Sequence, residues 1–173
     1  MANGKIFCII GGLLTLISTF ILAFGYVPIT GFGFFGIGFI TNMDNIFEDT
    51  FSYSILFGGQ EIVVYILFVI LLIFLVSGFI QLAGIKSRAA AIIGSILPIF
   101  ISLVFISDFY DVLFPEPLTN ITSFFWDLAI AEGVFPVHIP AGTIGMSMQV
   151  SLGTYLLLGG GILGVIGGII GIE

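Results

Sequence analysis

Four apolar stretches, each about 20 residues long and free of formally charged side chains, set the strongest limit on how this chain can fold. They run over residues 6–25, 62–80, 89–107 and 152–172. A helix needs about 20 consecutive apolar residues to cross a bilayer. Only 8% of the 173 residues are charged, whereas a soluble domain has about a quarter. The sequence therefore predicts an all-α integral membrane protein, with a single domain built as a four-helix transmembrane bundle.

The connections between these helices differ in length. Residues 81–88 join the second helix to the third in a tight turn, whereas residues 26–61 and 108–151 form two long loops. The cations Lys5, Lys86 and Arg88 then all fall on one side of the membrane, which the positive-inside rule makes cytoplasmic. We therefore expect a multi-pass protein of the plasma membrane with both termini in the cytoplasm and both long loops outside.

The two long loops are strongly acidic. They contain nine carboxylates and no Lys or Arg, so they would attract cations and repel anionic partners such as nucleic acids, or else serve as a solubilising rim. Carboxylate oxygens are also the ligands that calcium prefers. The candidate ligands for a divalent cation, the one cofactor that this pattern suggests, are Asp44, Glu48, Asp49, Asp108 and Asp111. The sequon at Asn120 adds a candidate glycosylation site in the second loop.

Small residues recur at helical spacing along three of the four helices. Close backbone approach over such residues is how membrane helices pack on one another. The candidate packing positions are Gly11, Thr15, Ser18, Ala91, Gly94, Gly153, Gly160, Gly164, Gly167 and Gly171. We expect the first, third and fourth helices to close the bundle through these faces, with the bulky second helix facing lipid or a neighbour. The alternative is that the glycine face of the fourth helix forms a subunit interface.

The four predicted helices contain no ionisable residue of the kind that marks proton relays, coupled transporters and voltage sensors. The sequence also lacks a G-x-S-x-G motif and a plausible Ser, His and Asp set. These observations favour a protein that is not an enzyme. Pro98 should kink the third helix, and a nearby Ser or Thr is the expected partner for the carbonyl that it frees.

The segment TGFGFFGIGFI, residues 30–40, alternates glycine with large apolar residues and predicts a strand with a bulge at Phe34-Phe35. A strand cannot face lipid with unpaired backbone groups, so its edges should pair with the second loop or with another chain. Aromatic residues of the second loop are expected at the membrane interface, against the first loop or against another subunit. The candidate oligomer interface comprises Gly31, Phe32, Gly33, Phe34, Phe35, Gly36, Gly38, Phe39 and Trp126.

The layout resembles that of the tetraspan families, claudin-like proteins and tetraspanins, which have four helices, cytoplasmic termini and two outer loops. The chain lacks the Gly-Leu-Trp motif and cysteine pair of the first family and the Cys-Cys-Gly of the second. The resemblance implies a protein that organises membrane or assembles side by side, as a homo-oligomer or hetero-complex. Two alternatives stay open: a subunit of an oligomeric cation-selective channel, and an accessory subunit of a membrane enzyme.

Overall fold

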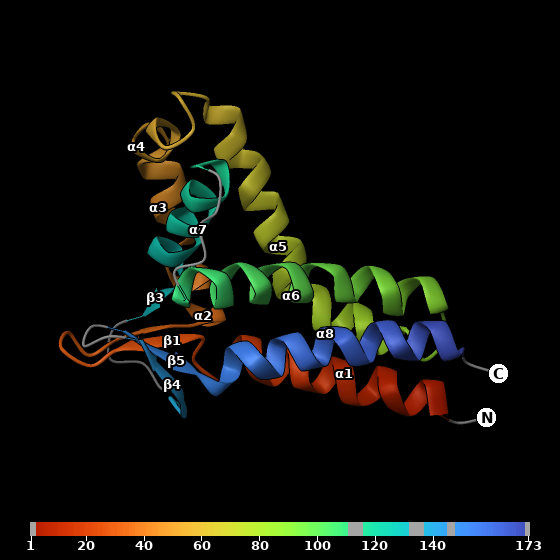
Figure 1. Cartoon of the computed structure of the whole chain (residues 1–173). Coiled ribbons are helices and arrows are strands. Elements are labelled where there is room, and N and C mark those ends of the chain that lie inside the picture. Colours follow the sequence, from red (N-terminus) through yellow and green to blue (C-terminus); the bar gives the residue numbers. More distant parts are fainter. Residues whose placement is uncertain (1–2, 111–115, 132–136, 145–147, 172–173) are drawn as a thin grey trace.

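The computed structural model describes residues 3–110, 116–131, 137–144 and 148–171, and this part of the chain is mostly helical. Four helices are long and apolar enough to cross a membrane, as expected: α1 (Asn3–Phe20), α5 (Glu61–Ala83), α6 (Arg88–Phe109) and α8 (Leu152–Ile170). Helices α1, α6 and α8 run alongside one another, whereas α5 crosses them at a steep angle (Figure 1). Both termini lie at one end of this bundle, here called the terminus end, and the long connections gather at the opposite loop end (Figure 1). The arrangement fits an integral multi-pass membrane protein.

Two helix boundaries differ from the expected ones for identifiable reasons. Helix α1 stops at Phe20 rather than at residue 25, because the chain beyond it enters a strand at Gly25. Helix α5 continues to Ala83, so that Gln81 belongs to its last turn and not to the connecting loop. The tight turn that follows ends at Ser87, whose hydroxyl accepts a hydrogen bond from the Ala90 N–H at 3.3 Å and caps α6.

The two long connections fold together into one unit at the loop end. The first provides β1 (Gly25–Val27), β2 (Phe32–Phe34), α2 (Gly36–Thr41), α3 (Met43–Glu48) and α4 (Thr50–Ile55). The second provides α7 (Glu116–Ala129), β3 (Ile130–Ala131), β4 (Pro140–Ile144) and β5 (Met148–Ser151). Their strands form one antiparallel sheet in the order β3-β2-β1-β5-β4, in which both connections contribute neighbours. We call these elements together the loop module.

The segment over residues 30–40 is a strand only in its first half. Strand β2 pairs with β1 and with β3, so one of its edges meets the second connection, as expected. The expected bulge at Phe34-Phe35 is wrong, because the chain leaves the sheet there and starts α2 at Gly36. A Cβ at Gly36 would overlap the carbonyl oxygen of Thr19, so only glycine lets α2 begin this close to the end of α1. The resulting sheet is larger than the short β segment that the sequence suggested.

Small residues bring the backbones of α1 and α8 into direct contact. A Cβ added at Gly160 would lie 2.9 Å from the carbonyl oxygen of Gly11, and one added at Gly11 would lie 2.8 Å from the amide nitrogen of Gly164. Helix α6 packs on the other side of α8, where a Cβ at Gly161 would come within 3.2 Å of the Ser95 carbonyl oxygen. Such close approach supplies the dispersion contacts that hold helices together in lipid.

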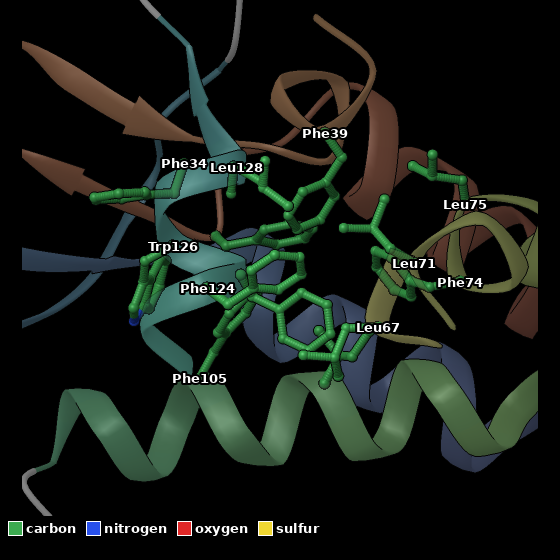
Figure 2. Close-up of a cluster of buried hydrophobic side chains, with 14 of the residues drawn as sticks. Phe34, Phe39, Leu67, Leu71, Phe74, Leu75, Phe105, Phe124, Trp126 and Leu128 are labelled. Carbon is green, nitrogen blue, oxygen red and sulfur yellow. The ribbon is translucent and has the colours of Figure 1, made fainter. Parts of the chain in front are cut away.

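Large apolar side chains fill the space that opens between α5 and α6 toward the loop end. Phe105 of α6, Phe74 of α5 and Phe124 of α7 converge there with residues of α2 and β2 (Figure 2). Phe39 of α2 is fully buried, with its ring centroid 6.1 Å from that of Phe74. The loop module and the bundle therefore share one core.

Candidate functional site

Trp126 of α7 is the centre of the contact between the loop module and the bundle. Its ring stacks on Phe105 with centroids 4.3 Å apart, and Phe34 and Phe109 meet it edge-on at 4.5 Å and 5.1 Å. Its indole N–H donates a hydrogen bond to a carboxylate oxygen of Asp108 at 2.6 Å. Both the apolar surface and the polar atom of Trp126 are thus satisfied within one chain.

A polar cavity of about 360 Å³ opens on the surface of α3 and α4. Its lining comprises Asn45, Glu48, Asp49 and Tyr53. Burial, followed by the charges of Asp127 and Asp49, raises the pKa of the Tyr53 hydroxyl above its usual value. Burial likewise raises the pKa of the Asp127 carboxyl, although its side chain stays partly accessible at the surface. The cavity therefore presents two carboxylates of the first connection, Glu48 and Asp49, beside Tyr53, whose hydroxyl pKa is also raised by the charge of Asp127 from the second connection.

The carboxylates predicted as metal ligands do not gather into a metal-binding set. Within the described residues, no group of three or more His, Cys, Asp or Glu side chains is placed to hold an ion. Asp44 is exposed, Asp49 accepts a hydrogen bond from the Ser52 hydroxyl at 2.7 Å, and Asp108 accepts the bond from Trp126. Asp111 lies outside the described residues. A cation cage would need six to eight oxygens, and the described arrangement does not assemble one.

Inside the bundle, Gln81 of α5 is fully buried and links three helices. Its side-chain N–H donates to the carbonyl oxygen of Gly94 in α6 at 3.1 Å, and its side-chain oxygen accepts from the Thr15 hydroxyl of α1 at 3.0 Å. Gly94 lies four residues before Pro98, and proline has no N–H to donate to that carbonyl. The partner of the freed carbonyl is therefore the Gln81 amide, not the Ser or Thr that the sequence suggested.

The small residues expected at helix contacts lie inside the chain. Gly11, Thr15, Ser18, Ala91, Gly94, Gly153, Gly160, Gly164, Gly167 and Gly171 are all buried. A Cβ at Gly153 would overlap the Ala23 carbonyl oxygen, and one at Gly167 would lie 2.8 Å from the Gly4 carbonyl oxygen. The glycine face of α8 is thus occupied by α1 and α6.

Most residues proposed for an oligomer interface are also covered by the same chain. Phe34, Phe35, Phe39 and Trp126 are buried, and so are Gly33, Gly36 and Gly38. Gly31 is exposed at the turn between β1 and β2, and Phe32 is half-buried. The segment that the sequence favoured for assembly therefore serves first to build the loop module.

Two asparagines and the histidine hold parts of the loop module together. The side-chain amide of Asn42 donates to the carbonyl oxygens of Leu128 and Ile130 at 2.9 Å and 2.6 Å, which joins the two connections. The amide nitrogen of Asn120, the atom a glycan would modify, donates to the Leu56 carbonyl oxygen at 2.7 Å. His138 stacks on Tyr26 with ring centroids 4.7 Å apart.

Gln81, Asn42 and Tyr53 were not predicted as functional residues from the sequence. For Gln81 a signal was present: it is a lone amide directly after an apolar stretch, in a chain with a proline inside the next helix. Asn42 and Tyr53 gave no such signal, because their partners lie in the second connection, 86 and 74 residues further along the chain. Their roles depend on how the two connections meet.

The fold and this arrangement define a class of protein: a multi-pass membrane protein of four candidate spans, whose two long connections form one folded unit at the loop end. Comparison with family models, curated proteins and solved structures finds no match to the chain.

Proposed function

We propose that this chain is a non-enzymatic scaffold of the plasma membrane that gathers partner proteins, or further copies of itself, around its loop module. In this proposal both termini face the cytoplasm and the loop module faces outward, in line with the positive-inside rule. The main support for the proposal is that strands from both connections pair in one sheet and so build a single module. Its attachment through Trp126 to the bundle core makes a preorganised surface, which lowers the entropic cost of binding.

The internal use of the small-residue faces supports this choice of surface. Helices α1, α6 and α8 already cover one another's glycines, so the bundle offers those faces to no second protein without opening. The exposed parts of the loop module include the turn between β1 and β2, where Ile29 is 77% exposed. Partners are therefore expected at the module and not at the glycine face of α8.

The charge of the module points to the kind of partner. The long connections contain nine carboxylates and no Lys or Arg, and Glu48 and Asp49 border an open cavity. A basic protein surface would be attracted to such a face, and the attraction would weaken as salt screens it.

Native mass spectrometry of complexes extracted in mild detergent, at low and high salt, tests the proposal. We expect bound basic partner proteins that dissociate at high salt, and weaker binding of these partners after Glu48→Gln. The control Glu173→Gln removes one negative charge near the C-terminus and should leave association unchanged. Monomers alone at low salt would contradict a scaffold, and a fixed place in one enzyme complex would favour the accessory-subunit alternative.

The acidic cavity favours one further candidate, a subunit of a cation-selective pore. Carboxylates at a pore mouth concentrate cations, and Glu48 and Asp49 would have this role. The closely packed bundle would need several copies of the chain to enclose a water path. A closed ring of copies that conducts cations in planar bilayers, and loses selectivity in the Glu48→Gln variant, would decide for the pore.

A further inference from the structure

A stripe of large apolar side chains is exposed on the short helices α3 and α4. Phe47, Phe51 and Ile55 are 55%, 67% and 63% exposed, although they follow one another at a spacing of four residues. The neighbouring side chains Ile46 and Thr50 are buried against the rest of the chain. The helices therefore pack on the protein with one face and present an apolar face outward. We call Phe47, Phe51 and Ile55 the apolar stripe.

The apolar stripe is continuous with the exposed apolar surface of α5. The ring of Phe47 meets the ring of Phe68 of α5, with centroids 5.2 Å apart and planes at 78°. Phe68 lies one turn from Tyr65 and Leu72, which are exposed on α5. Helix α5 has no charged residue after Glu61 and is long and apolar enough to cross a membrane, so we expect its exposed side to face lipid. The stripe thus begins where a lipid-facing surface ends.

Asn45 and Glu48 of α3 lie away from Phe47, whereas the exposed Asp44 lies about 60° from Phe47 around the helix. At 100° per residue, Asn45 lies about 160° from Phe47 around α3, and Glu48 about 100°. Both side chains line the acidic cavity. Separation of a polar and an apolar face on a helix that is not buried is typical of segments that lie in the membrane interface.

We propose that α3 and α4 form an interfacial anchor, with the apolar stripe inserted into the leaflet at the loop end of the bundle. A bilayer fits this face better than a second copy of the chain does. A second copy would bring carboxylates together, because residues 26–61 contain acidic residues but no Lys or Arg to pair with them. The same charge favours a neutral leaflet over an anionic one, since anionic headgroups repel it.

Site-directed spin labelling in the full chain tests this anchor. In a Cys8→Ala background, which removes the only native thiol, nitroxides are attached after Phe51→Cys and, as the matched control one residue away, Ser52→Cys. Ser52 is exposed, lies about 100° from Phe51 around α4, and donates a hydrogen bond from its hydroxyl to Asp49. The proteins are placed in phosphatidylcholine vesicles, and collisions with oxygen and with a water-soluble nickel chelate are compared.

We expect the label at position 51 to collide preferentially with oxygen, which concentrates in the acyl region, and the label at position 52 to collide preferentially with the nickel chelate. The preference at position 51 should fall in phosphatidylglycerol vesicles. Equal access of nickel at both positions would overturn the anchor, because the stripe would then lie in water. Low access of both reagents at position 51, together with spin–spin broadening, would instead assign the stripe to a contact with a second copy. If the oxygen preference at position 51 is the same in phosphatidylglycerol, the inferred selectivity for neutral lipid is wrong.

Discussion

Replacing Gln81 by methionine should destabilise the bundle, and the loss of stability should be larger when residue 98 is proline than when it is alanine. Gln81→Met keeps a side chain of similar length but removes the bond to the Gly94 carbonyl and the bond from Thr15. Interhelical hydrogen bonds in membrane proteins contribute about 0.6 kcal/mol on average and at most about 1.7 kcal/mol. The loss of two such bonds should therefore lower the free energy of unfolding by about 1 to 3 kcal/mol.

In a Pro98→Ala background the same replacement should cost less. An alanine at this position has an N–H that can donate to the Gly94 carbonyl in the ordinary helical way, so that this oxygen no longer depends on Gln81. The remaining cost is that of the Thr15 bond, and the coupling between positions 81 and 98 should be about 0.6 to 1.7 kcal/mol.

The four proteins of this double-mutant cycle can be compared by equilibrium unfolding in mixed micelles with added dodecyl sulfate. Circular dichroism follows the helices, and the fluorescence of Trp126, the only tryptophan, follows the core shared with the loop module. Thr15→Val is the matched control, since it removes a bond to Gln81 but does not touch the Gly94 carbonyl. Its cost should be the same in the native background and in the Pro98→Ala background. An equal cost of Gln81→Met in both backgrounds would refute the assignment of Gln81 as the partner of the freed carbonyl.

Two further predictions concern the glycine contacts and acid. Gly160→Ala should be less stable than Gly159→Ala by about 1 to 3 kcal/mol in the same unfolding assay. The reason is that a Cβ at Gly160 would meet the α1 backbone, whereas a Cβ at Gly159 would meet nothing within 4 Å. Both changes gain the same helix propensity, so equal stabilities would contradict the contact. Burial raises the pKa of Asp127 in the folded chain, so the fold favours the protonated carboxyl. The free energy of unfolding should therefore rise modestly as the pH falls toward about 4, the ordinary pKa of an aspartate. Asp127→Asn should reduce this dependence, and an identical pH profile in the variant would assign it to other groups.

The four helices could be predicted because each is specified by local pattern. Charge-free apolar stretches mark the spans, and the spacing of residues such as Gly11, Gly160 and Gly164 marks the faces along which α1 and α8 pack. These signals lie within single helices and need no knowledge of the rest of the fold. The end of α1 was misplaced, because the residues after Phe20 are as apolar as a helix but pair in the sheet.

The loop module could not be predicted, because its contacts join residues far apart in the chain. Gly25 pairs with Val150 across the sheet, and no local pattern in either connection specifies that register. The burial of Phe34 and Phe39 was missed for the same reason, because their core partners lie far along the chain. Phe34 contacts Trp126 of α7, and Phe39 contacts Phe125 of α7 and Phe74 of α5. Gln81 was missed for a different reason, since a single amide after an apolar stretch resembles the start of a polar loop.

The close packing of the glycine-rich helices explains why the aromatic residues gather where they do. Where α1 and α8 touch through Gly11 and Gly160, their backbones leave no room for large side chains between them. Helix α5 is bulky and diverges from α6 toward the loop end (Figure 1), and large apolar side chains occupy the space between the two helices there. The loop module fills that space with Phe39 and Phe124, which pack against α5 and α6 in the shared core (Figure 2). Because interiors are packed to crystal-like density, a change in the tilt of α5 would require Phe39, Phe74 and Phe124 of this core to repack.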